Sequence, residues 1–133
     1  CVSRGRAADR EVAPDGAPFV GCPRTTLKRV IALAGERGFQ LRAGPESEFF
    51  LFQTKSGRPT TESHDSASYF DLSPVDQGEE VRREIVLALQ SIGIHVDAAH
   101  HEVAPGQHEI DFHPDDALTT ADNISTFRFV VKN

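Results

Sequence analysis

The sequence contains no methionine, and its first residue is cysteine. A complete translation product that kept its start residue would contain at least one methionine, so we expect the 133 residues to be a piece of a longer protein. No apolar run approaches the roughly 20 residues that a membrane-spanning helix needs. No signal-peptide pattern opens the chain either. We therefore expect no membrane among its partners.

Cysteine is scarce, and negative charge outweighs positive charge. The two cysteines, Cys1 and Cys22, have a spacing that fits no metal-binding motif. Two reduced thiols are favoured over a Cys1–Cys22 disulfide, which nothing else in the sequence supports. The formal net charge is −6 and the basic residues are scattered, which argues against a nucleic-acid partner. A chain of this length is long enough for one domain with a hydrophobic core.

The first half of the chain passes from a polar lead-in to periodic segments. Residues 1–20 are polar, rich in arginine and broken by proline, and we interpret them as loop. Apolar residues at helical spacing then predict a helix that begins near Thr25 and ends at Gly38. Residues 39–52 predict one long strand, or two pieces broken at Gly44-Pro45.

The second half predicts two more helices around a pair of strands. Residues 53–68 have the composition of a surface loop. A helix follows, with Ser73 or Asp76 as its N-cap and Gly93 at its end. The last helix begins at 114–116, where two acids favour its N-terminus. The order of elements is helix, strand, helix, two strands, helix, which indicates an α/β (α+β) fold of antiparallel strands with packed helices.

Carboxylates stand in unusual positions around the strand pair. Residues 96–112 predict two short strands that meet at a turn of Pro105 and Gly106. If these are the central turn residues, Glu102 and Glu109 lie opposite each other. Like charges in that position destabilise a strand pair, so a divalent cation between them is the natural partner.

Two further acids support the same interpretation. Period 2 places Glu46 and Glu48 on one face of a strand. Oxygen ligands without cysteine suit Mg²⁺ or Mn²⁺. The alternative is that both acids face solvent at a strand start and that the strand pair is an exposed ribbon. His100 and His101 alternate faces, so they cannot both contact one cation.

Two long runs carry a family resemblance. Residues 44–52 and 100–112 resemble the catalytic domain of type I glutamine synthetases, and the similarity covers about residues 14–133. The resemblance implies that residues 21–133 form the N-terminal part of that domain, incomplete at both ends. The segment 1–12 fits the family poorly.

The resemblance also implies a reaction and a set of ligands. The family condenses L-glutamate with ammonia at the expense of ATP, through γ-glutamyl phosphate, at a site with two Mg²⁺ or Mn²⁺ ions. Motif matching assigns Glu48, Glu102 and Glu109 to the ion nearer the substrate and Glu46 to the ion nearer ATP. Asp97 would contact ATP, where the family usually has glutamate. No catalytic residue is assigned within the chain.

The assembly and the alternatives follow from the same resemblance. It implies a cytoplasmic double ring of identical subunits, a dodecamer, with active sites at subunit boundaries. We expect the isolated chain to be inactive. One alternative is a γ-glutamyl-polyamine or other γ-glutamyl-amine ligase of the same family, although the run 104–109 favours glutamine synthetase. A non-catalytic structural homologue is a further alternative, and the four retained acids argue against it.

Overall fold

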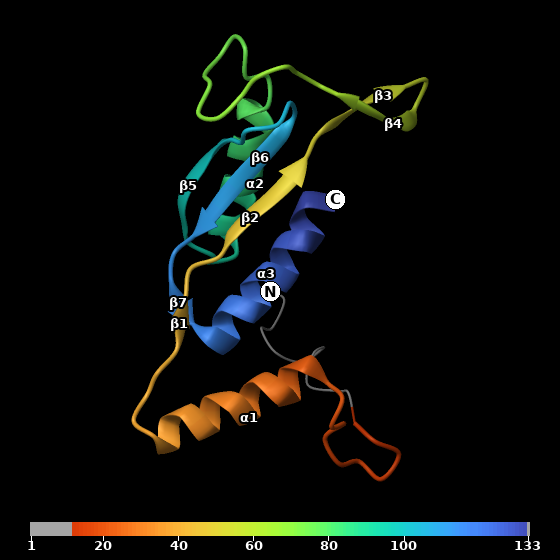
Figure 1. Ribbon diagram of the computed structural model, residues 1–133. Helices are drawn as coiled ribbons and strands as arrows, with labels where there is room; N and C mark the ends of the chain where they lie inside the picture. Colours follow the sequence, from red (N-terminus) through yellow and green to blue (C-terminus); the bar gives the residue numbers. More distant parts are fainter. Residues whose placement is uncertain (1–11, 133) are drawn as a thin grey trace.

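The computed structural model describes residues 12–132 as helices and antiparallel strands (Figure 1). The elements in chain order are α1 (Pro23–Glu36), β1 (Arg42–Ala43), β2 (Glu46–Phe50), β3 (Phe52–Lys55), β4 (Arg58–Ser63), α2 (Glu79–Ser91), β5 (Val96–His101), β6 (Gln107–Phe112), β7 (Asp115–Asp116) and α3 (Ala117–Lys132). The predicted α/β (α+β) class of antiparallel strands with packed helices is confirmed. The possible Cys1–Cys22 disulfide involves a residue outside the described range.

The central element is a three-stranded antiparallel sheet in the order β2-β6-β5. β6 lies in the middle, and its residues 108–111 each pair with a residue on both sides. Glu109 of β6 pairs with Glu48 of β2 and with His100 of β5. Two smaller pairs, β1-β7 and β3-β4, extend from the central sheet (Figure 1).

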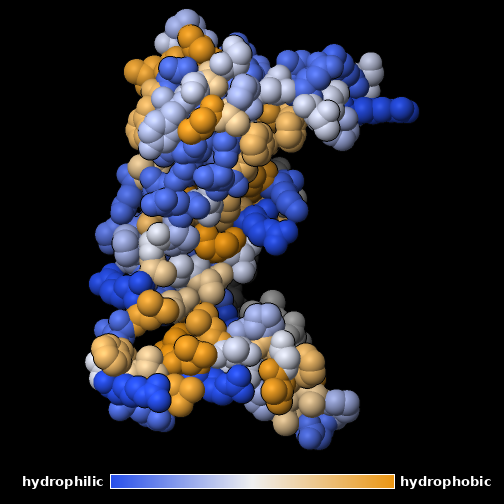
Figure 2. All heavy atoms as spheres, viewed as in Figure 1, coloured by the Kyte–Doolittle hydropathy of each residue, from blue (hydrophilic) through white to orange (hydrophobic). Residues whose placement is uncertain are grey.

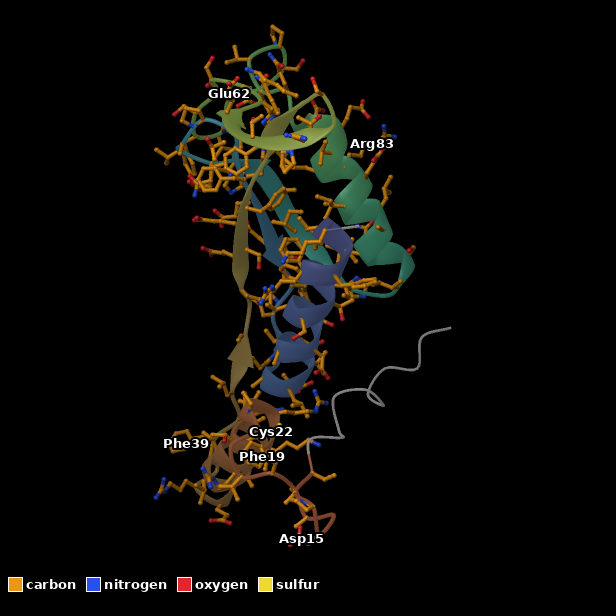
Figure 3. The ribbon with its side chains drawn as sticks, turned by 90° about the vertical axis from the view of Figure 1, so that its right-hand side faces the viewer. Asp15, Phe19, Cys22, Phe39, Glu62 and Arg83 are labelled. Carbon is orange, nitrogen blue, oxygen red and sulfur yellow. The ribbon has the colours of Figure 1, made fainter. Side chains whose placement is uncertain are left out.

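The hydrophobic core lies between this sheet and the helices α2 and α3. Ile110 and Phe112 of β6 are buried against Leu89 of α2 and Phe127 of α3. The rings of Phe112 and Phe127 meet edge to face with centroids 5.4 Å apart. Figure 3 shows both helices on the same side of the sheet, and no described helix covers its other face. No described helix is both long enough and apolar enough to cross a membrane.

Two helices end where glycine was predicted to end them. In α1, Gly38 N donates to Gly35 O and Phe39 N donates to Ala34 O, which is the pair of bonds of a Schellman motif. Gly93 closes α2 in the same way. Both glycines have positive φ, +80° and +81°, a conformation that costs other residues more.

The helix starts agree with the sequence less well. The last helix was predicted to begin at 114–116, but α3 begins at Ala117 and the two acids before it form β7. The Oδ1 of Asp116 accepts from the N–H groups of Leu118 and Thr119. The prediction for α2 is wrong, because the helix begins after Gly78 rather than after Ser73 or Asp76. The Asp76 carboxylate is used elsewhere, in a buried ion pair with Arg82.

The prediction of a surface loop at 53–68 is also wrong for most of that segment. β3 and β4 form a hairpin closed by Ser56 and Gly57, which both have positive φ. This is the backbone of a tight primed turn. The side chains of β3 are all exposed, so no alternation of apolar and polar residues marks the strand.

The α1 end of the molecule exposes much apolar surface. α1 contains no fully buried side chain. Its link to α3 includes Arg24, whose Nη2 donates to Asp122 Oδ2 at 3.0 Å. Figure 2 shows apolar side chains gathered at this end. Exposed members of this region are Phe19, Val20, Val30, Leu33, Phe39 and Leu41.

Candidate metal centre

The uncovered face of the central sheet is acidic because the strands alternate. In β2, Glu46, Glu48 and Phe50 are exposed, whereas Ser47 and Phe49 are partly buried on the helix side. The predicted shared face of Glu46 and Glu48 is therefore confirmed. Antiparallel pairing continues this face across β6, where Glu109 lies beside Glu48 and Asp111 lies beside Glu46.

Pro105 and Gly106 are the central residues of the turn between β5 and β6, as predicted. The predicted pairing of residues across the two strands is wrong. Gln107 N donates to Ala104 O at 2.9 Å, and Gly106 has φ of +70°, the value that the third residue of a type II turn requires. However, Glu102 N donates to Gln107 O, so Glu102 is aligned with Gln107 rather than with Glu109. The backbone of a type II turn does not match the twist of the two strands. Val103 and Ala104 therefore have no partner residue in the pairing of β5 with β6.

Glu102 nevertheless reaches the same place as the other acids. Glu48, Glu102 and Glu109 each offer a carboxylate oxygen, and these oxygens lie within 4.8 Å of one another. Gln107 Nε2 donates to Glu48 Oε2 at 2.6 Å, and Val103 N donates to Glu102 Oε2 at 2.8 Å. Three separate segments of the chain therefore direct carboxylates to one point.

Glu109 is the buried member of this group, with 6% of its surface exposed. Burial, the hydrogen bonds with Asp111 and Glu102, and the charges of both acids together raise its pKa to about 8. Asp111 Oδ1 is itself buried without a hydrogen-bond partner. An acid in these surroundings ionises readily only if a cation arrives beside it.

The donor set fits a hard divalent cation. Carboxylate oxygens without thiolate are the ligands of Mg²⁺ and Mn²⁺. His100, Glu109 and Asp111 form an adjoining group that shares Glu109 and also has ligand atoms within 4.8 Å. Glu46 belongs to neither group. It lies at the other end of β2, opposite Asp111.

Asp97, the residue predicted to contact ATP, lies apart from these groups at the register shift of β5. Its carboxylate is exposed and bonds to His113 Nδ1 at 3.0 Å.

Two aromatic residues, Tyr69 and Phe70, pack beside the acids, and the sequence did not predict this position. Phe70 stacks on the His100 ring with centroids 4.2 Å apart, and Tyr69 meets the same ring edge to face at 5.5 Å. Phe70 N donates to His101 O, and its φ of +57° is strained for a phenylalanine. The positive φ of Phe70 has no signal in the sequence.

A second concentration of polar groups lies behind the sheet, on the helix side. Arg82 pairs with Asp76, and its Nη1 donates to His108 Nδ1 at 2.8 Å. A guanidinium only donates, so Nδ1 holds the lone pair and the proton is on Nε2. This leaves His108 without a free lone pair for a metal. The histidine groups that contain it, with His64 or with His101, are therefore poor cation sites despite their spacing.

The chain matches known proteins over most of its length. Residues 20–133 match the family model described as glutamine synthetase, catalytic domain. A glutamine synthetase of Thermus thermophilus is 64% identical over 121 residues, which are 90% of this chain and 27% of that protein. One of Clostridium saccharobutylicum is 58% identical with the same coverage. The chain thus spans about 27% of the length of these relatives.

Solved structures agree with the sequence matches. A structure described as a GmaS/ADP complex superposes with a TM-score of 0.75 at 34% identity, over 89% of this chain and 28% of that one. A cryo-EM structure of Plasmodium falciparum glutamine synthetase gives a TM-score of 0.72 over 90% of this chain and 29% of that one. Its identity of 24% supports the fold alone.

Proposed function

The chain belongs to the glutamine synthetase family, whose catalytic domain residues 20–133 match, and on this premise we propose that the protein carrying it condenses L-glutamate with ammonia at the expense of ATP. The γ-carboxylate of glutamate attacks the terminal phosphorus of ATP, ADP leaves, and ammonia then displaces phosphate from γ-glutamyl phosphate. The ADP in the related GmaS structure supports an adenine nucleotide as the co-substrate.

The observation that carries the proposal is the meeting of Glu48, Glu102 and Glu109. Their oxygens lie within 4.8 Å of one another, and the most buried of them has a pKa of about 8. Such an arrangement is unfavourable without a cation. We propose that these three hold one Mg²⁺ or Mn²⁺ ion and that Glu46 contributes to a second. When bound, such ions neutralise the phosphate oxygens of a transferring phosphoryl group.

The chain's own contribution is to place these acids rigidly. Glu48 and Glu109 are direct neighbours across β2 and β6, so the ladder sets their separation. No described helix lies on the side of the sheet that carries them (Figure 3). Asp97 is proposed to contact ATP from the outer strand β5. Its exposed carboxylate is available for that role.

Assembly and location are further parts of the proposal. We propose identical subunits in a double ring, a dodecamer, located in the cytoplasm; membership of the family supports an oligomer. Because the chain spans about 27% of its relatives' length, the reaction belongs to the whole protein. The 133 residues alone are expected to form no glutamine.

The test is an assay of the whole protein with glutamate, ammonia, ATP and Mg²⁺ or Mn²⁺, with glutamine and phosphate as readouts. Glutamine formation that is lost in Glu102→Gln and Glu109→Gln supports the proposal. Preference for a polyamine or another amine over ammonia would support the γ-glutamyl-amine ligase instead. Absence of ATP-dependent product with any acceptor would refute both and favour a non-catalytic homologue.

A further inference from the structure

Asp65 is a buried acid that lies outside the metal centre, in the segment between β4 and α2. Its side chain is 0% exposed. Its Oδ1 accepts from Gly106 N at 3.0 Å and lies 3.1 Å from His101 Nε2. Its Oδ2 accepts from Gln77 N at 3.0 Å and lies 3.1 Å from His64 Nε2. One carboxylate therefore joins segments that are up to 41 residues apart.

Two of these contacts lead directly to the proposed metal ligands. Gly106 is a central residue of the turn between Glu102 and Glu109. His101 precedes Glu102, and its Nδ1 lies 2.6 Å from Glu102 O. Asp65 thus contacts the connection between the two acids at one point in the turn and, through His101, at a second point beside Glu102.

The turn lies close against Ser63, the last residue of β4, and against Leu51, which directly precedes β3. A Cβ at Gly106 would lie 2.4 Å from Ser63 Oγ and 2.9 Å from Leu51 O. Leu51 N also donates to Gly106 O at 2.9 Å. The bond from Gly106 N to Asp65 and the bond from Leu51 N to Gly106 O therefore both hold the turn against this part of the chain.

We infer that Asp65 is a positioning residue that holds Glu102 and Glu109 at the separation a shared cation requires. The inference rests on the proposed function, since it concerns the same cation. An asparagine at position 65 keeps only one acceptor oxygen, so its NH2 group would face either Gly106 N–H and His101 or Gln77 N–H and His64 in a buried place. Groups that orient metal ligands in this way typically contribute 10- to 100-fold to affinity.

Asp65 is ionised at neutral pH, so both of its oxygens can accept hydrogen bonds. Burial alone would raise its pKa, but hydrogen bonds from Gln77, His101 and Gly106 lower it to about 2. The carboxylate therefore stays ionised throughout the range in which an enzyme would work.

The test is Mn²⁺ binding to the whole protein, measured by calorimetry, for Asp65→Asn. Its matched control is Asp71→Asn, an exposed acid of the same segment that accepts a local bond from Ser68 N. We expect the dissociation constant to rise about 10-fold or more in Asp65→Asn and to stay unchanged in Asp71→Asn. Excess Mn²⁺ should restore the activity of Asp65→Asn but not that of Glu109→Gln, which lacks a ligand.

Unchanged Mn²⁺ affinity in a folded Asp65→Asn protein would overturn the inference. If Glu109→Gln also bound Mn²⁺ normally, the proposed centre itself would be refuted. Hydrogen exchange of the Gly106 amide in the parent protein gives a readout that needs no variant. We expect it to be slow and to slow further when Mn²⁺ is added. Fast exchange, or exchange that Mn²⁺ does not change, would contradict the inference that Asp65 holds the turn in place.

Discussion

At the scale of single residues, the metal centre depends on one carboxyl group that is unfavourable to ionise. Glu109 is buried and has two acids for neighbours, so its pKa is about 8 rather than its ordinary 4.5. A cation must displace a proton from it near neutral pH. Metal affinity should therefore increase with pH up to about 8.

The same group makes the stability of the metal-free protein depend on pH. Between about pH 4.5 and about 8 the folded state holds a proton on Glu109 that the unfolded chain has released. The free energy of unfolding therefore falls as pH rises through this window. We expect Glu109→Gln to remove this slope, as measured by urea unfolding with a chelator present. Glu62→Gln, at an exposed acid paired with Lys55, should keep it, and an unchanged slope in Glu109→Gln would contradict the assignment.

Two adjacent arginines on α2 give a second prediction. Arg82 is buried and bonds Asp76 and His108, whereas Arg83 is exposed on the outer side of the helix (Figure 3). Arg82→Met would leave the Asp76 charge buried without a partner, which typically costs about 3–5 kcal/mol. Arg83→Met should change stability by less than about 0.5 kcal/mol. If both variants lost the same free energy of unfolding in denaturant, the buried contacts of Arg82 would not stabilise the protein.

The sequence could predict part of the residue-scale picture. The argument from opposed like charges brought Glu102 and Glu109 together, although the register behind it was wrong. The structure brings Glu48 to the same point, and metal binding by these acids stays a prediction. Asp65 and Arg82 could not be predicted, because their partners Gly106 and His108 are distant in sequence and follow only from the packing of the hairpin on the segment before α2.

At the scale of elements, glycine decides where helices end. Gly38 has φ of +80° at the end of α1, whereas Gly35 lies inside the helix with open space at its Cβ position. Gly35→Ala should stabilise the protein by about 0.5–1 kcal/mol, because alanine loses less backbone entropy. Gly38→Ala should destabilise it by about 1–2 kcal/mol, because alanine avoids positive φ. Thermal unfolding of the two variants should shift in opposite directions, and a shift of the same sign would contradict this account.

These helix ends were predictable because a Schellman motif is local. The strands β3 and β4 were not, since their exposed Ser, Thr and Gln side chains follow no apolar period. The start of α2 was missed for another reason. Asp76 has the chemistry of a helix cap, but a buried arginine six residues later takes its carboxylate.

At the scale of the whole molecule, the sheet has two different faces. One is covered by α2 and α3 and holds the core together with the polar network of Asp65, Asp76, Arg82 and His108. The other is uncovered and carries the acids. The division follows from strand alternation alone, which places Glu109 on one face and its neighbours His108 and Ile110 on the other. The sheet therefore carries the hydrophobic core on one face and the candidate metal centre on the other.

The most direct measurement is anomalous scattering from a crystal of the whole protein soaked in Mn²⁺. We predict a difference peak in contact with carboxylate oxygens of Glu48, Glu102 and Glu109 together. The peak should be absent when the crystal contains Glu109→Gln protein. A well-occupied peak at the buried histidines, or none near the three acids, would contradict the central claim that this face of the sheet holds a divalent cation.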